Sequence, residues 1–136
     1  MNIELGISSF GETTPLEETG KAISHDQRIR DLLEEIILAD KLNIDAFAIG
    51  EHHRKDFAVS APEIILAAAA SKTKQIHLSS ATTNLPTINQ IRVYEQYATM
   101  DAIAPGRVEI MASPAGVRPR SFTSRPRRKN ASSAPA

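Results

Sequence analysis

Residues 1–112 alternate short apolar runs with longer amphipathic segments, and this alternation leaves few folds open to the chain. The longer segments carry apolar side chains at the i, i+3, i+4, i+7 spacing of a helix, and the short runs have the length of strands. We therefore predict an α/β fold with the order β-α-β-α-β-α-β. The predicted strands lie at 3–7, 46–49, 76–81 and 107–112, and the predicted helices at 24–42, 61–71 and 88–103.

Each predicted helix begins with a hydroxyl residue three positions before a Glu or Gln. The pairs are Ser24 and Gln27, Ser60 and Glu63, and Thr87 and Gln90. In such a capping box the hydroxyl accepts a hydrogen bond from the N3 amide, and the longer side chain reaches back. Asn43 and Gly106 lie where two of the helices should end in a left-handed conformation.

A β-α-β order implies parallel strands joined by right-handed helical crossovers. All four strands then deliver the chain to the same edge, so residues 8–11, 50–53, 80–84 and those after 112 should converge. Ligands bind at this edge both in open α/β sheets and in barrels. The polar run Glu51-His52-His53 directly follows the second predicted strand, and it therefore lies where a site is expected.

Glu51-His52-His53 allows three interpretations. A zinc site of the protease type needs His-Glu-x-x-His on one helix face, whereas successive side chains at a strand end point to opposite sides, so we predict no metal site. A structural Glu-His pair is the second interpretation. We favour the third, in which one histidine donates a proton or a hydrogen bond to an anionic ligand.

Composition excludes several classes of protein. The chain has no cysteine, so disulfide scaffolds, thiolate zinc sites and cysteine nucleophiles are ruled out. No apolar run reaches the roughly 18 residues of a membrane span, and the first ten residues are too acidic and too short for a signal peptide. We expect a cytoplasmic protein. No Walker motif and no G-x-G-x-x-G follows any predicted strand.

Residues 113–136 differ sharply from the rest of the chain. Residues 1–112 hold all 16 acidic residues and 10 of the 16 Lys and Arg, a net charge of −6, and the remaining basic residues lie in the tail. The tail has four prolines and no helical or strand periodicity, so we predict a disordered basic segment. Its single aromatic residue, Phe122, argues against specific nucleic-acid binding.

Four stretches of the chain together resemble a known family. They are "IELGISSFGETTP", "AFAIGEHHRKDFAVSAPEIILAAAASKTK", "IHLSSATTNLPT" and "QYATMDAIAPGRVEIMA". In this order and spacing they look like successive landmarks of the luciferase-like flavin-dependent monooxygenases, the superfamily of the bacterial luciferase subunits and the coenzyme F420-dependent reductases. The resemblance covers residues 1 to about 112. As a set these motifs are specific, whereas Glu-His-His alone is weak.

The resemblance implies the amino-terminal half of a (β/α)₈ barrel. Family members bind reduced FMN, or alternatively F420, at the carboxyl ends of the strands, and use it to activate oxygen or to transfer hydride to or from a small organic substrate. His52 matches the family's active-site histidine, with Glu51 and His53 beside it as expected cofactor contacts. Ala81 and Thr82 match the place where the family has a non-prolyl cis peptide against the flavin ring.

The chain departs from the family after the fourth predicted strand. A Gly-Arg-Gly-like turn that helps to hold the flavin phosphate is replaced by Ser113-Pro114-Ala115, and proline has neither the charge nor the N–H that phosphate binding uses. Four strands cannot close a barrel, which usually takes about 250 residues. We therefore predict a truncated flavin-dependent oxidoreductase with little activity alone, and a tail translated out of frame. The alternative is a non-catalytic half-barrel that self-associates through its open sheet edges.

Overall fold

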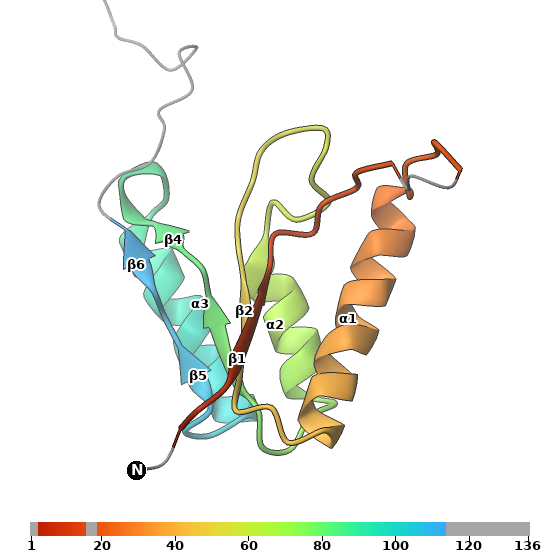
Figure 1. Cartoon of the computed structure of the whole chain (residues 1–136). Helices are drawn as coiled ribbons and strands as arrows, with labels where there is room; N and C mark the ends of the chain where they lie inside the picture. Colours follow the sequence, from red (N-terminus) through yellow and green to blue (C-terminus); the bar gives the residue numbers. More distant parts are fainter. Residues whose placement is uncertain (1–2, 16–18, 114–136) are drawn as a thin grey trace, which may run out of the picture.

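The computed structural model describes residues 3–15 and 19–113 (Figure 1). Most of the predicted tail lies outside these ranges, and so does Pro114. The elements are β1 (Gly6–Ser9), α1 (His25–Lys41), β2 (Ala46–Ile49), α2 (Pro62–Ala70), β3 (His77–Ser80), β4 (Thr83–Asn84), the 3₁₀ turn η1 (Leu85–Thr87), α3 (Gln90–Ile103), β5 (Val108–Glu109) and β6 (Ala112–Ser113). Ser113, the first residue of the predicted tail, therefore belongs to a strand.

The main sheet has four parallel strands in the order β1-β2-β3-β5. The predicted β-α-β-α-β-α-β order is confirmed, and the three helices cover one face of the sheet (Figure 1). We call this the outer face and the opposite one the inner face. Within the described residues β1 and β5 each pair with one neighbour only, so both edges of the sheet are open.

Two predicted strands differ from the structure. The first begins at Gly6 rather than Ile3, because β2 begins only at Ala46 and offers the preceding residues little to pair with. Ile3 and Leu5 are correspondingly 78% and 60% exposed. The fourth predicted strand is divided into β5 and β6, and β6 pairs with β4 in a separate parallel ladder.

The core lies between the sheet and the helices. Phe47 and Ile49 of β2 and Leu78 of β3 face the helices and are almost fully buried. Leu32 and Ile36, on the predicted apolar face of α1, cover them. Because side chains alternate along a strand, Ala46, Ala48, His77 and Ser79 must lie on the inner face.

One of the three predicted capping boxes starts its helix as expected. Ser24 Oγ accepts a hydrogen bond from the Gln27 N–H at 3.2 Å. The prediction for Ser60 was wrong, because α2 begins at Pro62 with Ala61 before it and no side-chain cap. Thr87 is not a cap either. It ends the turn η1, and α3 starts at Gln90, with Asn89 as its N-cap. Asn89 Oδ1 accepts hydrogen bonds from two backbone N–H groups.

Helix ends at the two predicted left-handed positions are confirmed. Asn43 has φ 59° and follows α1 closely, and Gly106 has φ 72° and follows α3. In this conformation glycine has no side-chain penalty and asparagine a small one. Both residues turn the chain toward the amino end of the next strand.

A polar network closes the amino end of the sheet. Asp40, at the end of α1, is 8% exposed, and its carboxylate accepts from the N–H groups of Lys74, Gln75 and Ile76 at 2.9–3.2 Å. Burial opposes ionisation, but these N–H groups together with the charge of Arg107 hold the pKa of Asp40 below its usual range.

Arg107 completes this network from the start of β5. Its guanidinium donates to the carbonyl oxygens of Ala70, Thr73 and Ile76 and to Thr73 Oγ1, all at 3.0–3.1 Å. The bond to Ala70 satisfies the carbonyl group of the last residue of α2, and the bonds to Thr73 hold the turn that follows the helix. Asp40 and Arg107 therefore fix the turns before β3 and β5 from two sides.

Candidate active site at the carboxyl ends of the strands

The predicted site residues lie on two segments that meet at the carboxyl end of the sheet. Glu51, His52 and His53 follow β2 after Gly50, and Ala81 and Thr82 follow β3. The Ala81 N–H donates to the Ile49 carbonyl at 2.7 Å, which joins the start of the second segment to the end of β2. The Ala81–Thr82 peptide is cis, as the family resemblance implied.

The two histidines have different surroundings. The imidazole of His52 lies 4.3 Å from the Phe57 ring and 5.1 Å from the Phe10 ring, measured between centroids. Its backbone N–H donates to the Val59 carbonyl at 2.9 Å. His52 is thus held by aromatic contacts on a loop that folds back on itself.

His53 instead forms a hydrogen bond with Glu51. Its Nε2 lies 2.6 Å from Glu51 Oε1, and the side chain of His53 is 66% exposed while that of Glu51 is 12% exposed. The alternation expected at a strand end is therefore present, since residues 51 and 53 pair with each other and residue 52 has other neighbours. The structural Glu-His pair considered in the sequence is therefore formed by Glu51 and His53. Among the described residues, no carboxylate is paired with the imidazole of His52.

The loop after His53 carries an ion pair between Arg54 and Asp56. Arg54 donates two hydrogen bonds, of 3.0 and 2.6 Å, to the carboxylate of Asp56. These bonds hold the pKa of Asp56 below its usual range. The guanidinium also lies 5.4 Å from the centroid of the Phe57 ring. Arg54 therefore supports the ring that contacts His52.

Three residues near the site were missed by sequence reasoning. Phe10 and Phe57 come from two different loops, and Asn84 lies on β4 just after the cis peptide. In the described part of the chain, Asn84 Oδ1 is the one buried side-chain oxygen or nitrogen without a hydrogen-bond partner. A single sequence carries no signal for these placements, because each depends on how distant segments pack.

Asn84 lies on the inner face of the sheet. Its neighbour Thr83 is buried on the outer face, where its hydroxyl donates to Ser80 Oγ at 2.7 Å and lies 3.5 Å from the hydroxyl of Tyr97 on α3. The next side chain along a strand points the opposite way. The partnerless oxygen of Asn84 is therefore on the same side of the sheet as Ala48 and Ser79.

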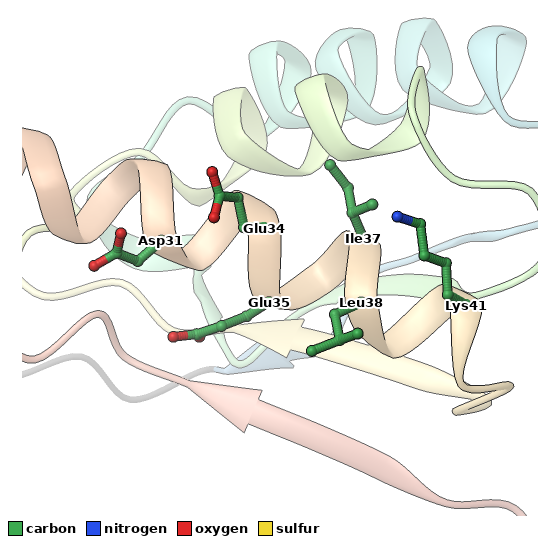
Figure 2. Close-up of a pocket in the computed structure, with 6 residues that line it drawn as sticks. All are labelled: Asp31, Glu34, Glu35, Ile37, Leu38 and Lys41. Atoms are coloured by element: carbon green, nitrogen blue, oxygen red, sulfur yellow. The ribbon is translucent and has the colours of Figure 1, made fainter.

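A groove on α1 is separate from this site (Figure 2). It has a volume of about 510 Å³, and its lining residues are Asp31, Glu34, Glu35, Ile37, Leu38 and Lys41. All of them lie along the body of α1 and not at the carboxyl ends of the strands. We assign no ligand to this groove.

The described residues contain neither a metal-ligand cluster nor a membrane-spanning helix. Within residues 3–15 and 19–113, no three His, Asp or Glu side chains are placed to hold a metal ion together. No helix in the same ranges is long and apolar enough to cross a bilayer. The cytoplasmic location inferred from the sequence stays a prediction.

Comparison with known proteins identifies the family of the chain. The model of the luciferase-like monooxygenases matches residues 3–126, which is most of the chain. The chain belongs to the luciferase-like monooxygenase family. The match runs past Ala112 into the basic tail, and the resemblance seen in the sequence is confirmed.

Relatives of this luciferase-like chain include monooxygenases. The N-acetyl-S-alkylcysteine monooxygenase of Bacillus subtilis is 35% identical over 54% of this chain and 22% of its own length. The oxygenase component of the flavin-dependent trigonelline monooxygenase of Acinetobacter baylyi is 31% identical over 65% of this chain and 26% of its own. The chain thus spans about a quarter of the length of these relatives.

A solved structure shares the fold. The oxygenating constituent of 3,6-diketocamphane monooxygenase from Pseudomonas putida, in complex with FMN, superposes with a TM-score of 0.73. It is 24% identical, and the alignment covers 88% of the luciferase-like chain and 31% of the other. The described residues therefore correspond to part of a luciferase-like barrel.

The inner face at the carboxyl end fits a flat ring cofactor. Ala48 and Ser79 carry small side chains on this face, whereas the space over Gly50 is filled by the ring of Phe10. Asn84 Oδ1 is buried and still needs a donor, and an N–H of a heterocycle is such a donor. These residues therefore suit a flavin ring, although the position of its phosphate lies outside the described residues.

Proposed function

We propose that this chain is the flavin-binding part of an oxidoreductase that acts on a small organic substrate, with FMN as cofactor and F420 as the alternative. The observation that carries the proposal is the meeting of the Glu51–His53 segment with the Ala81–Thr82 segment at the carboxyl ends of parallel strands. Ligands bind at that end in barrels of this type.

The predicted site residues have different roles in catalysis and in flavin binding. His52 is the catalytic residue, since an imidazole can give or take a proton near neutral pH. Ala81 and Thr82 support the flavin ring from one side, and Glu51 and His53 line the cofactor site as a pair. When bound, the flavin supplies the oxygen-activating or hydride-transferring chemistry.

Flavin affinity of the chain alone is expected to be weak. The four-stranded sheet offers one arc of a barrel, and Pro114 replaces the arginine-containing turn that the resemblance associates with the phosphate. A fluorescence titration of FMN with the purified 136-residue chain tests this. Binding at micromolar concentration or tighter would show that the arc suffices and that the proposed dependence on the remaining barrel is wrong.

Catalysis is tested in a completed barrel. Residues 1–112 are joined to all of the N-acetyl-S-alkylcysteine monooxygenase of Bacillus subtilis that lies beyond the corresponding part, and the chimera is compared with its His52→Ala variant. We expect turnover to fall by about 10²–10⁴-fold, the usual range for a positioned proton-transfer group. A His53→Ala variant is the matched control and should lose less. If His52→Ala keeps the rate and loses the fold, His52 is structural.

Self-association is the second candidate function. Large apolar side chains are exposed at both open edges, among them Ile7 of β1 at 45%, Ile110 at 44% and Met111 at 52%. An unclosed sheet also presents unpaired N–H and C=O groups. Sedimentation velocity on the 136-residue chain separates the two functions: a discrete dimer that does not bind FMN favours the interaction module, and a monomer excludes it.

The out-of-frame origin of the tail is a separate proposal. If it is correct, translating the nucleotides after the Ala112 codon in the other two frames yields a Gly-Arg-Gly-like turn followed by further β-α units. Failure of both frames to yield them would mean that the tail is native. The coding DNA alone is enough for this test.

A further inference from the structure

Phe10 lies over the carboxyl end of β2 and beside His52. The two ring centroids are 5.1 Å apart, with 49° between the ring planes. Gly50 lies directly beneath the Phe10 ring, and a β-carbon built on Gly50 would collide with ring atoms Cδ1 and Cε1. The position of the Phe10 ring therefore requires glycine at residue 50.

The backbone on both sides of Phe10 is anchored to the second loop. The Ser9 carbonyl accepts from the Gly50 N–H at 2.9 Å, and the Gly11 carbonyl accepts from the Ala58 N–H at 2.8 Å. Gly11 has φ 66°, a conformation that disfavours other residues. The backbone of the first loop is thus pinned before and after Phe10, which fixes the point from which its side chain extends toward His52.

Helix α1 holds the same loop from the outer side. Ser9 Oγ accepts hydrogen bonds from the Gly11 N–H and from Arg28 Nη2, each at 3.1 Å. Arg28 is itself fixed by Glu35 at 2.9 Å, and its side chain is only 14% exposed. A chain of contacts therefore runs from α1 through Ser9 to the Phe10 ring.

His52 has a second aromatic neighbour from its own loop. Phe57 lies 4.3 Å from the imidazole, and its backbone is held by the Arg54 carbonyl at 3.2 Å and by a β-bridge to Glu12. Glu12 belongs to the loop that carries Phe10. The imidazole therefore contacts two rings that the backbone ties to each other.

We propose that Phe10 is a positioning residue for His52 and that Gly50 is the residue that admits it. An imidazole acts in proton transfer only when its nitrogen is held at the right place, and packing of the supporting side chains does this. The inference rests on the proposed function for the meaning of that position. The geometry itself can be tested without flavin.

The test is NMR spectroscopy of the histidine rings in the full 136-residue chain. The four histidines are assigned by substitution, with His52→Gln identifying the His52 ring signals. Phe10→Ala should shift the His52 ring protons and weaken their cross-peaks to Phe57. Gly50→Ala should do the same, since it displaces the Phe10 ring. His53 and His77 should keep their signals, because neither has an aromatic contact among the described residues.

The double variant gives the sharpest result. If Gly50→Ala acts through Phe10, it should cause no additional shift of His52 in a Phe10→Ala background. Phe10→Tyr, which keeps the ring, should retain the wild-type His52 signals. Additive shifts in the double variant, or unmoved His52 signals in Gly50→Ala, would overturn the proposal.

The experiment also distinguishes unfolding of the variant from loss of the contact, and failure of the positioning role from failure of the proposed function. If Phe10→Ala collapses the dispersion of the whole backbone spectrum, Phe10→Leu replaces it with the same expected shifts, because it keeps apolar volume without a ring. If the His52 signals behave as expected and the completed barrel does not bind flavin, the proposed function fails and the positioning contact stands. If instead the completed barrel binds flavin and the His52 signals do not change, Phe10 has no positioning role and the proposed function stands.

Discussion

The two ends of the sheet use polar groups in opposite ways. At the amino end, the charged groups of Asp40 and Arg107 each form several hydrogen bonds. The carboxylate of Asp40 accepts from three backbone N–H groups, and the guanidinium of Arg107 donates to four oxygen atoms. At the carboxyl end, Asn84 Oδ1 has no partner and His53 is two-thirds exposed. Stability is therefore concentrated at one end, and unsatisfied binding capacity at the other.

Asp40→Ala should have the largest effect on folding. The change leaves three buried N–H groups without an acceptor and Arg107 without its counter-charge, so we expect a loss of about 3 kcal/mol in the free energy of unfolding. Urea denaturation followed by circular dichroism measures it. Asp101→Ala is the control, since its exposed carboxylate accepts a single N–H bond of 2.9 Å, and it should cost below about 1 kcal/mol. Equal losses in the two variants would refute the contrast between the ends.

Arg107→Ala should rank second. It removes four hydrogen bonds to the end of α2 and to the turn between α2 and β3, and we expect a loss of about 2 kcal/mol. Arg92→Ala is the matched control, because the exposed Arg92 pairs with Glu95 at 3.5 Å and should contribute below about 0.5 kcal/mol. Thermal melts of the two variants side by side show whether the bonds of Arg107 matter beyond its charge.

Stability should also depend on the ionisation of Asp40. Its pKa is depressed in the folded chain, so its contribution is fully present above the unfolded value of about 3.9 and is lost as the pH falls through the folded value. The stability difference between wild type and Asp40→Asn should therefore be constant near neutrality and shrink below about pH 4. Urea midpoints measured from pH 7 to pH 2.5 test this. A difference that grows on acidification would reverse the assigned sign.

Asn84→Ala should have the smallest effect. No hydrogen bond of Asn84 Oδ1 is lost, so the free energy of unfolding should stay within about 0.5 kcal/mol of wild type or rise slightly. The neighbouring Thr83→Ala is the control, since it removes a buried 2.7 Å bond to Ser80 and should cost about 1–2 kcal/mol. In the completed barrel Asn84→Ala should instead weaken FMN binding. A strongly destabilised Asn84→Ala would move this residue to the structural side of the comparison.

Much of the fold follows from local patterns. The helical spacing from Ile29 to Ile37 and the short apolar runs were enough to predict parallel order. Parallel order was enough to place Glu51, His52 and His53 at the carboxyl edge of the sheet. Turn residues such as Asn43 were equally readable, because a left-handed backbone restricts the residue type.

The remaining features depend on contacts that no local pattern encodes. Ser60 and Thr87 have the composition of caps, but Pro62 and the turn η1 move the helix starts. The role of Arg107 requires the turn after α2, with Thr73 34 residues earlier in the chain, to lie beside it. The partners of His52 come from loops whose packing is set by backbone bonds between them. The cis peptide was predicted from family resemblance and not from the residues themselves.

The division of the fourth strand has a geometrical consequence for the site. Between β3 and β5, Leu78 pairs with Val108 and Ser79 with Glu109, whereas beyond them Thr83 pairs with Ala112 and Asn84 with Ser113. The Ala81–Thr82 side therefore holds one residue more than its partner, which is the definition of a β-bulge. An extra residue reverses the phase of side-chain alternation, so that Thr83 turns outward to Tyr97 and Asn84 inward. Deleting one residue here would exchange the two side chains. The buried amide oxygen of Asn84 would then leave the inner face, although Asn84 itself would be unchanged.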